Sequence, residues 1–561
     1  MRSNIRNFSI IILYIYSSLI FADTQNQPAV ATANEIATRT GLEILKKGGN
    51  AFDAAAAITA SLAVVEPYGS GLGGGGFWLL HRNVDNKQVV IDGREIAPLR
   101  SDKNMYLDRN GNIIKGLSLN GPMSSGIPGI VAGIEHLVKN YGRLSLKEIL
   151  KPAIQQAKHG FIVTERYRKL IRYREYIMRK YKSTASIFFI NNNIPKLGDF
   201  IIQEDLSETL SMIAEKGSEG FYQGNFAQKI VDNIQKNGGI WETYDLANYE
   251  IIEREPIFID YKGVKITSVP PPSSGGVVLG QALNILEKFD LTRYDSATRK
   301  HIIIESMRRA YRDRAAYLGD SDFIYIPVDR LLDKNYAEGL ALTIDIDRAT
   351  PSSELGSIAT AENVGTNTTH FSVVDRDGNM VSSTLSINLP FGSGFVVEGT
   401  GIILNNEMDD FTIKPLTANN YGLIGNQANT IHPGKRPLSS MTPIFIESKD
   451  RIAILGTPGG SRIISMVLLA VLDFVKGELP DSWVSLPRFH HQYIPDLVQY
   501  EMGGLSVDEK RKLVFKGHKL KEIKRKYGNM QAIMIWRNRN TSFVASDPRG
   551  EGSAESIHIY K

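Results

Sequence analysis

Residues 363 to 388, NVGTNTTHFSVVDRDGNMVSSTLSIN, contain the clearest folding signal in the sequence. The dipeptide Asp377-Gly378 is typical of a β-hairpin turn, and alternating apolar and polar residues flank it on both sides. A turn centred near Asp377 pairs residues whose numbers add up to about 754, which places Thr368 opposite Ser386. Asn388 follows two residues later and shares the face of Ser386. The stretch therefore predicts a hairpin that gathers two hydroxyls and an amide at the mouth of a sheet.

Thr368, at the start of this hairpin, has two interpretations. The first is a strand start, because threonine has a high β-propensity. The second is a nucleophile that is exposed when the bond between Asn367 and Thr368 is cut. A threonine hydroxyl needs an adjacent base, and a threonine that begins a chain has one in its own α-amino group, which titrates near about pH 8. The hairpin alone leaves both interpretations open.

The composition is that of an ordinary globular protein. The chain has 561 residues, of which 42% are hydrophobic and 22% are charged, and its formal net charge is +5. This balance argues against a disordered or membrane-integral chain, and the small net charge does not indicate a nucleic-acid partner. We interpret the basic run at residues 516 to 528 as a solvated helix face. The lack of cysteine excludes disulfides, thiolate metal sites and cysteine nucleophiles.

Residues 1 to 22 have the pattern of a secretory signal peptide. Two arginines precede an apolar run of 14 residues, and the small residue Ala22 ends it before a polar stretch. The run is too short for a comfortable membrane span. An uncleaved anchor is the alternative, because Ile20 stands where a small residue is preferred. We expect a periplasmic or secreted protein, cleaved near Ala22, without stable membrane insertion.

The order of helical and strand-like patterns divides the chain near residue 368. Residues 30 to 66 predict two helices, and residues 125 to 345 are mostly helical by periodicity. Residues 346 to 367 are polar and lack periodicity, which indicates an exposed, mobile segment. Strand-like runs follow at 369 to 375, 380 to 388, 443 to 447 and 451 to 456, with helices near 462 to 475 and 507 to 516.

Seven motifs in one order make the sequence resemble the γ-glutamyltranspeptidase family, bacterial type, whose members are threonine hydrolases of the N-terminal nucleophile superfamily. The resemblance covers nearly the whole chain after residue 22. It implies a four-layer αββα sandwich, two stacked and mainly antiparallel sheets flanked by helices, which periodicity alone does not predict. The motifs are GSGLGGGGF (69 to 77), DGREIAP (92 to 98), TTHFSVVDRDGN (368 to 379), GIILNNEMDDF (401 to 411), KRPLSSMTP (435 to 443), GTPGGSR (456 to 462) and PRFHHQ (487 to 492).

The resemblance implies a precursor that cuts itself. Thr368 would attack the carbonyl of Asn367, and hydrolysis of the resulting ester would give a large subunit of residues 23 to 367 and a small subunit of residues 368 to 561. The two subunits would stay together as a heterodimer with one continuous fold. Thr368 would then take the γ-glutamyl group of glutathione or a related compound and pass it to water, an amino acid or a peptide. No cofactor and no metal are implied.

The resemblance also assigns the site residues that handle the glutamyl head group. Arg94 matches the arginine that binds the α-carboxylate, and a guanidinium fork suits a carboxylate. Glu407 and Asp410 match the pair that receives the α-ammonium group. The remaining residues are Ser439 and Ser440, which match two further carboxylate ligands, and Asn388, which matches an asparagine at the amino-acid head.

Three further positions complete the implied site. Gly459 and Gly460 match the glycines whose N–H groups form the oxyanion hole, and such a donor typically contributes roughly 3 kcal/mol in the transition state. Tyr421 falls where bacterial members have a lid tyrosine over the pocket. We interpret the glycine run at residues 69 to 77 as close packing near the site, because it lacks the features of a dinucleotide loop.

The family usually has threonine where this chain has Ser386, and serine keeps the hydroxyl but loses the methyl group that restricts the rotamer. We expect the role of the hydroxyl to survive. His490 and His491 resemble a metal-binding pair, but no third ligand has a suitable spacing, so we assign them a structural role.

Two alternatives to a glutathione hydrolase stay open. A relative with a different acyl substrate, such as a cephalosporin acylase or a poly-γ-glutamate depolymerase, would share the nucleophile and could lose the glutamyl-binding residues. An unprocessed binding protein would keep the fold without catalysis. The presence of Arg94, Glu407, Asp410, Ser439 and Ser440 together favours a γ-glutamyl substrate.

Overall fold

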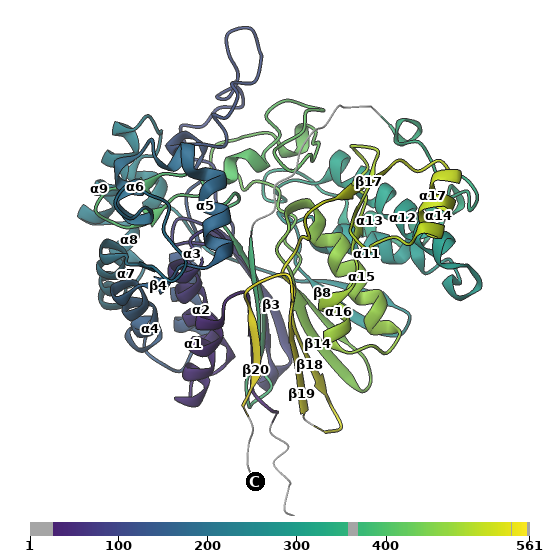
Figure 1. Cartoon of the computed structure of the whole chain (residues 1–561), viewed down its shortest axis with the longest axis horizontal. Helices are drawn as coiled ribbons and strands as arrows, with labels where there is room; N and C mark the ends of the chain where they lie inside the picture. Colours follow the sequence, from purple (N-terminus) through teal and green to yellow (C-terminus); the bar gives the residue numbers. More distant parts are fainter. Residues whose placement is uncertain (1–25, 357–367, 540, 558–561) are drawn as a thin grey trace, which may run out of the picture.

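The protein is a four-layer sandwich with two β-sheets in the middle and helices on both outer faces (Figure 1). The structure is a computed structural model that describes residues 26–356, 368–539 and 541–557. Helices of the first part of the chain cover one sheet, and helices from the middle and the end cover the other. The αββα architecture implied by the family resemblance is therefore confirmed.

The first sheet has seven strands and places the nucleophile hairpin near its centre. Strands β9 and β10 form this hairpin, and strands from the N-terminal part of the chain pair with it on both sides. All pairings in this sheet are antiparallel. The strand order is β20 (Ser553–Ser556), β1 (Ala29–Thr32), β9 (Thr369–Val374), β10 (Met380–Ser386), β2 (Gly75–Arg82), β3 (Lys87–Gly93) and β6 (Ile252–Arg254).

The second sheet has six antiparallel strands, and smaller strand groups lie outside the two main sheets. Its order is β19 (Thr541–Ser546), β18 (Gln531–Trp536), β14 (Arg451–Gly456), β13 (Ile444–Glu447), β8 (Val264–Ser268) and β7 (Ile257–Tyr261). The smaller groups are β4 (Phe161–Ile162) with β5 (Phe200–Ile201), β11 (Val396–Val397) with β12 (Ile402–Ile403), and β15 (Phe489–His490) with β16 (Val498–Glu501) and β17 (Leu520–Ile523).

Seventeen α-helices are described in these parts of the chain, and they divide between the two outer layers. Those packed on the first sheet are α1 (Glu35–Lys46), α2 (Ala51–Val65), α3 (Ile130–Tyr141), α4 (Leu146–His159), α5 (Glu165–Met178), α6 (Lys182–Phe188), α7 (Glu204–Lys216), α8 (Glu219–Tyr222), α9 (Gly224–Lys236) and α10 (Thr243–Ala247). Those packed on the second are α11 (Gly275–Leu286), α12 (Ser296–Tyr317), α13 (Val328–Leu332), α14 (Lys334–Leu342), α15 (Ile463–Val475), α16 (Pro480–Ser485) and α17 (Val507–Phe515). None of the helices within the described ranges has the length and apolar content of a membrane span.

Three hydrophobic layers hold the sandwich together. A small central layer between the sheets includes Phe77, Phe445 and Ile533, and each outer layer joins one sheet to its helices. Burial of apolar surface of this extent is the main stabilising contribution to a fold of this size. Helix α2 is buried along its whole length, as its nearly continuous apolar sequence predicts.

The hairpin has the predicted register. Leu385 pairs with Thr369, and the ladder continues toward the turn with the same offset. One step further in this register, Thr368 lies opposite Ser386. Gly378 has a φ of 84°, a left-handed conformation that glycine adopts without steric cost and that closes the turn.

Three expectations about local structure were wrong. Residues 29–32 form strand β1, not the start of a helix, because they add to the edge of the nucleophile hairpin and only the following Glu35 begins the helix. Residues 346–356 are not exposed throughout: Asp347 and Arg348 are exposed, but Ser352 is buried, and its hydroxyl donates to the Tyr493 carbonyl at 2.7 Å. The other residues of that segment, 357–367, lie outside the described residues. The basic run at 516–528 contains strand β17, paired with β16, and not a helix.

Candidate active site

A pocket opens where the nucleophile hairpin meets three loops of the C-terminal part and the end of strand β3. It contains every residue assigned from the family resemblance except Gly459. The lining residues are Arg94, Thr368, Ser386, Asn388, Glu407, Asp410, Tyr421, Leu423, Ser439, Ser440, Met441, Gly460, Ser461 and Ile463. Residues from seven separated stretches of the sequence therefore meet at one place.

The hairpin places Thr368 and the Ser386 hydroxyl together at this pocket. Side chains alternate along β9, and Ser372 on the same side as Thr368 donates to a carbonyl of the second sheet. Thr368 therefore faces the space between the sheets, at the edge where they open. The Ser386 hydroxyl oxygen accepts a hydrogen bond from the Asn388 N–H at 2.7 Å. That bond occupies a lone pair and leaves the Ser386 proton available to a second acceptor.

A close backbone approach explains part of the glycine-rich run. A Cβ atom on Gly74 would lie 2.2 Å from the carbonyl oxygen of Ser386, which is far inside van der Waals contact. Only glycine lets this segment pass behind the end of β10. The run at residues 69 to 77 thus has the close packing near the site that the sequence predicts.

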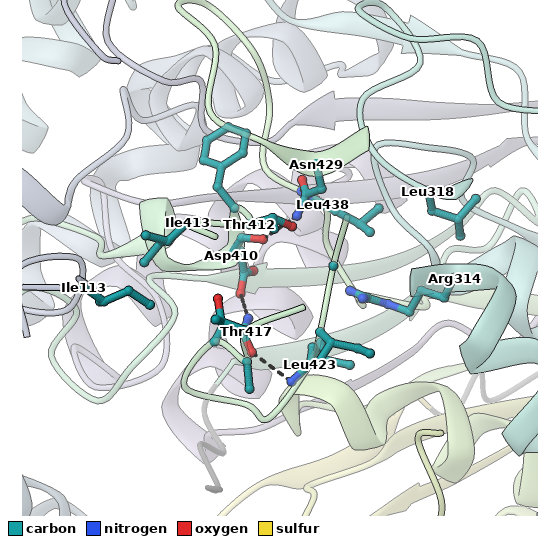
Figure 2. A pocket seen from close by; sticks show the side chains of 15 residues that line it. Ile113, Arg314, Leu318, Asp410, Thr412, Ile413, Thr417, Leu423, Asn429 and Leu438 are labelled. Carbon is teal, nitrogen blue, oxygen red and sulfur yellow. Dashed lines mark hydrogen bonds between the residues drawn. The ribbon is translucent and has the colours of Figure 1, made fainter. Parts of the chain in front are cut away.

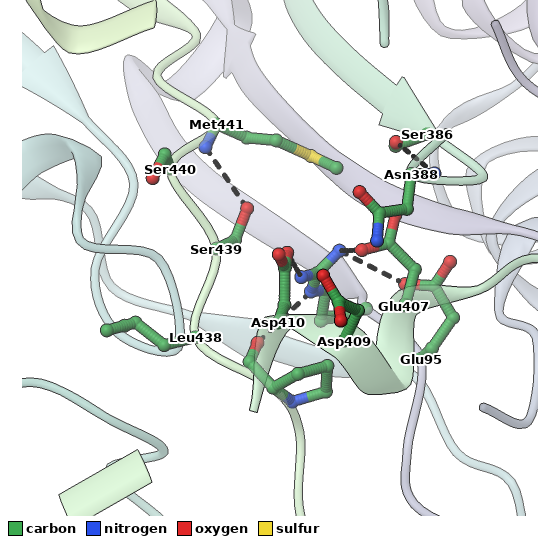
Figure 3. A network of polar contacts seen from close by, with 12 residues as sticks. Glu95, Ser386, Asn388, Glu407, Asp409, Asp410, Leu438, Ser439, Ser440 and Met441 are labelled. Carbon is green, nitrogen blue, oxygen red and sulfur yellow. Dashed lines mark hydrogen bonds and ion pairs between the residues drawn. The ribbon is translucent and has the colours of Figure 1, made fainter. Parts of the chain in front are cut away.

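Arg94 contacts three acidic residues, and Figure 3 shows the carboxyl groups of Glu95, Glu407 and Asp410 gathered in one place. Its Nη1 is 2.9 Å from a Glu407 carboxylate oxygen and 3.4 Å from one of Glu95, and its Nη2 is 2.6 Å from Asp410. Its Nε donates to the carbonyl of Pro437 at 3.1 Å. Arg94 is fully buried. The arginine and the acidic pair assigned to opposite ends of the substrate therefore contact each other directly in the structure.

The protonation of this group follows from its burial. Burial raises the pKa of Glu407 well above its usual range, and the neighbouring Arg94 guanidinium only partly offsets this effect. Burial also raises the pKa of the Glu95 carboxyl to about 7, again opposed by Arg94. The raised pKa values of Glu95 and Glu407, which lie beside the same guanidinium, favour a proton on this pair near neutral pH.

Two buried acceptors in the pocket have no hydrogen-bond partner among the described residues. They are Oε1 of Glu407 and Oδ1 of Asn388. The amide nitrogen of Asn388 is already used, because it donates to the Asn406 carbonyl at 2.8 Å and so directs the oxygen away from that contact. An unpaired buried acceptor costs free energy, so these two oxygens favour a ligand that donates hydrogen bonds.

Ser439 and Ser440 border the pocket on a different side. The Ser439 hydroxyl oxygen accepts from the Met441 N–H at 3.1 Å, and its backbone is tied to the loop before helix α11 through a hydrogen bond to Pro272. The Ser440 hydroxyl oxygen accepts from Arg314 at 3.3 Å. Both serines thus keep their own O–H group for another acceptor.

Tyr421 lines the pocket next to Gly460. Its hydroxyl donates to the Asn388 carbonyl at 3.0 Å, and its ring leaves so little room that a Cβ on Gly460 would lie 2.4 Å from it. Gly460 has a φ of 58°, which also favours glycine. Gly459 is adjacent in sequence but does not line the pocket, and it borders a neighbouring basic one.

The histidines are structural in their contacts. His490 bonds to Ser465 and to Gln492, and His491 bonds to Asp496 at 3.2 Å, so the two rings serve different partners. His370, which sequence reasoning left aside, is buried two residues after Thr368, and its burial lowers its pKa to about 3.

One group of residues elsewhere has the composition of a metal site. Within the described ranges, His301, Glu305 and His518 alone lie close enough together to hold an ion. However, the Glu305 carboxylate is already paired with Arg308 and Arg309, at 3.1 and 2.6 Å. These two cations make the place unfavourable for another.

Sequence reasoning missed Glu95, which contacts Arg94 without lining the pocket, and several residues that do line it. Glu95 adjoins Arg94 in the motif at residues 92 to 98, so its position next to the arginine was the available signal. Leu423, Met441 and Ser461 gave no chemical signal, because apolar and small residues next to a motif are ordinary packing positions.

The chain is similar to known proteins over most of its length. The sequence profile described as Gamma-glutamyltranspeptidase matches residues 37–557. The chain is 42% identical over 528 residues to the glutathione hydrolase proenzyme of Escherichia coli (strain K12), which covers 93% of this chain and 90% of that protein. It is 40% identical over 533 residues to the glutathione hydrolase proenzyme of Pseudomonas sp. (strain A14), covering 93% and 92%.

Solved structures give the same result. The cephalosporin acylase from Bacillus halodurans is similar with a TM-score of 0.83 and 27% identity, over 98% of this chain and 100% of that one. The γ-glutamyltranspeptidase of Helicobacter pylori is similar with a TM-score of 0.56 and 40% identity, over 63% of this chain and 96% of that one. The profile, the relatives and the shared fold together establish that this chain belongs to the gamma-glutamyltranspeptidase family of enzymes.

Proposed function

We propose that the protein is a self-processing threonine hydrolase and transferase that cleaves the γ-glutamyl amide bond of glutathione and related compounds. One observation supports this proposal above all. The nucleophile candidate Thr368 and a full set of groups for a zwitterionic head line the same small pocket. Membership of the family supports the same reaction class.

Self-cleavage comes first in this proposal. The Thr368 hydroxyl attacks the carbonyl carbon of Asn367, the peptide nitrogen leaves and takes a proton, and the chain is joined through an ester. The α-amino group of Thr368 is free from this point on. Water then hydrolyses the ester, which releases the carboxyl group of Asn367 and restores the Thr368 hydroxyl. Asn367 lies outside the described residues, while Thr368 is buried at the pocket, where Ser386 can donate a hydrogen bond to its oxygen.

The mature enzyme then uses Thr368 a second time. Its free α-amino group accepts the hydroxyl proton as Oγ attacks the γ-carbonyl carbon, and the N–H groups of Gly459 and Gly460 stabilise the oxyanion. The amine of the leaving group takes the proton and departs, which leaves a γ-glutamyl ester on Thr368. Water or the amine of an amino acid or peptide attacks this ester and regenerates the hydroxyl.

The head group is recognised at two ends in this proposal. The unpaired oxygens of Glu407 and Asn388, together with Asp410, receive the α-ammonium group. Arg94, Ser439 and Ser440 receive the α-carboxylate, and Tyr421 covers the bound group as a lid. The buried unpaired acceptors support this assignment, because an ammonium group supplies the donors that they lack.

We also propose that residues 23 to 367 and 368 to 561 remain associated as a heterodimer and that residues 1 to 22 direct export to the periplasm or beyond. Strand pairing supports the first point: β9 and β10 of the second segment lie between β1 and β2 of the first. The sequence pattern of the first 22 residues supports the second, although they lie outside the described residues.

An acylase that takes another acyl group is the second candidate, and the structural similarity to the cephalosporin acylase favours it. The curated relatives also include an acylase proenzyme of Pseudomonas sp. (strain SE83), 34% identical over 521 residues. An acyl group without an ammonium, such as glutaryl, would leave the oxygens of Glu407 and Asn388 without a hydrogen-bond donor. The γ-glutamyl substrate therefore fits the pocket better.

The test is a comparison of donors on the purified protein. Glutathione and a γ-glutamyl anilide should be hydrolysed, a glutaryl anilide far more slowly, and the Thr368→Ala variant should hydrolyse neither. Faster turnover of the glutaryl donor than of the γ-glutamyl donor would support the acylase. Absence of any hydrolysis by the wild-type protein would support a non-catalytic binding protein.

A further inference from the structure

Arg314 is a buried arginine next to the pocket, and the described part of the chain offers it no carboxylate partner. It lies in the last turn of helix α12 and is 5% exposed. No acidic group of the described residues is within ion-pair distance of its guanidinium, whereas Arg94 contacts three. Burial lowers the pKa of Arg314 to about 10, so that it stays charged at neutral pH. A buried cation without an anion is unfavourable, which indicates that an anion belongs nearby.

The contacts of Arg314 lead to the serine pair. Its Nη2 donates to the Ser440 hydroxyl oxygen at 3.3 Å, and its Nε donates to the Ser274 hydroxyl oxygen at 3.0 Å. The Ser274 hydroxyl in turn donates to the Ser439 carbonyl at 2.7 Å. Arg314 thus supports the backbone of one serine and the hydroxyl of the other. Because both bonds use oxygen lone pairs, the Ser440 proton is free to point into the pocket.

Arg314 also reaches the substrate pocket from a second side. It lines an adjoining pocket, which shares Asp410 and Leu423 with the substrate pocket. Figure 2 shows its side chain extending from α12 into this adjoining pocket, toward the segment that carries Asp410. The guanidinium is therefore one serine side chain away from the substrate pocket.

The donors of Arg94 explain why a second arginine is needed. A guanidinium has five N–H groups. Four of those of Arg94 are directed at Pro437, Glu407, Glu95 and Asp410, which leaves one for a substrate. Its charge is also balanced by carboxyl groups that surround it. Arg94 alone is thus a poor partner for a further carboxylate.

We propose that Arg314 is a positioning residue of the α-carboxylate subsite. It orients Ser439 and Ser440 and supplies the positive charge that Arg94 has already committed to the acidic group. This inference rests on the proposed γ-glutamyl substrate and deepens it. It adds Arg314, behind the serine pair, to Arg94, Ser439 and Ser440 at the carboxylate end of the substrate.

The test replaces Arg314 with Met and with Lys and compares two chromogenic donors. A γ-glutamyl anilide has both head-group charges, while a 4-aminobutanoyl anilide lacks only the α-carboxylate. We expect Arg314→Met to raise the KM of the γ-glutamyl donor roughly tenfold to a hundredfold with little change in kcat, because hydrogen bonds to charged groups contribute this much. The KM of the 4-aminobutanoyl donor should change less than about twofold, and Arg314→Lys should restore part of the loss.

Controls separate this role from a merely structural one. Arg309→Met removes another buried arginine of the same helix, which pairs with Glu305 and lines neither pocket, and it should leave the ratio of the two KM values unchanged. Competitive inhibition by L-glutamate and by 4-aminobutanoate gives the same ratio without turnover. If Arg314→Met fails to fold, as judged by circular dichroism, the same ratio is read from Arg314→Lys.

Two results would overturn the inference. One is an equal loss with both donors, which would make Arg314 a structural residue only. The other is an unchanged KM for the γ-glutamyl donor in a folded Arg314→Met protein. A wild-type protein that hydrolyses no γ-glutamyl donor would instead refute the proposed function, and the inference with it.

Discussion

The two sides of the pocket differ in how the charge of a buried arginine is balanced. On the acidic side, Arg94 lies among Glu95, Glu407 and Asp410, and its charge is balanced inside the protein. On the serine side, neutral hydroxyls line the pocket, and Arg314 stands behind them without an ion pair within the described part of the chain.

The difference concerns what each side offers to a ligand. The acidic side has surplus acceptors, since two of its oxygens have no partner in the described structure. The serine side has surplus donors and an unbalanced positive charge. A zwitterion placed with its ammonium on the acidic side and its carboxylate on the serine side satisfies both, whereas the reverse orientation satisfies neither.

The largest expected effect comes from the acidic side. Asp410→Asn should lower kcat/KM for a γ-glutamyl anilide roughly 100-fold to 1,000-fold, because it removes one member of a buried charge pair and leaves Arg94 less balanced. Steady-state kinetics with a glutaryl anilide, which lacks the ammonium group, should show a far smaller loss. An equal loss of kcat/KM with both donors would contradict the placement of the α-ammonium group on the acidic side.

Ser440→Ala should have a smaller effect on the opposite side. The variant loses one donor to the carboxylate, and we expect the KM of the γ-glutamyl donor to rise about tenfold. Substitution of Ser440 disturbs the loop less than substitution of Ser439, because the Ser439 hydroxyl also accepts a hydrogen bond from the Met441 N–H. Kinetics with a 4-aminobutanoyl anilide should reveal almost no change, and a tenfold change there would contradict the assignment.

The acidic side should also titrate, while the serine side should not. Glu95 has a usual pKa of 4.5 and a pKa of about 7 in the folded protein. Below pH 4.5, Glu95 is protonated in both the folded and the unfolded protein. Between pH 4.5 and about 7, only the unfolded chain loses this proton. The free energy of unfolding therefore falls as the pH rises through this range. Glu95→Gln should remove about 1 to 3 kcal/mol of this loss between pH 5 and pH 8.

Urea unfolding at both pH values measures this difference. Ser440→Ala is the matched control and should keep the pH dependence of the wild-type protein. A Glu95→Gln protein with the wild-type pH dependence would mean that Glu95 is ionised in the folded state throughout.

Ser386→Thr should produce the smallest change. Threonine keeps the hydroxyl that faces Thr368 and adds a methyl group that restricts its rotamer, so self-cleavage should be at least as fast as in the wild-type protein. The rate of fragment formation after synthesis gives the answer. Slower cleavage would show that the pocket is adapted to serine.

Local rules predict the hairpin, whereas most of the pocket residues were assigned through the family resemblance. The Asp377-Gly378 turn and the alternation around it fix the register, and the motifs lie in short, unbroken runs. Sequence reasoning missed strand β1, since its four residues become a strand only by pairing with β9, a partner distant in sequence. It also missed Arg314, because α12 is rich in charged residues and such a helix resembles an exposed one until the fold buries it.

The most direct test of the central claim is the state of the chain itself. Gel electrophoresis and N-terminal sequencing of the purified wild-type protein should give two fragments, the smaller beginning Thr-Thr-His-Phe at residue 368, and Thr368→Ala should give one uncut and inactive chain. A wild-type protein that stays uncut yet hydrolyses glutathione, or one cut at a different bond, would contradict the assignment of Thr368 as the nucleophile.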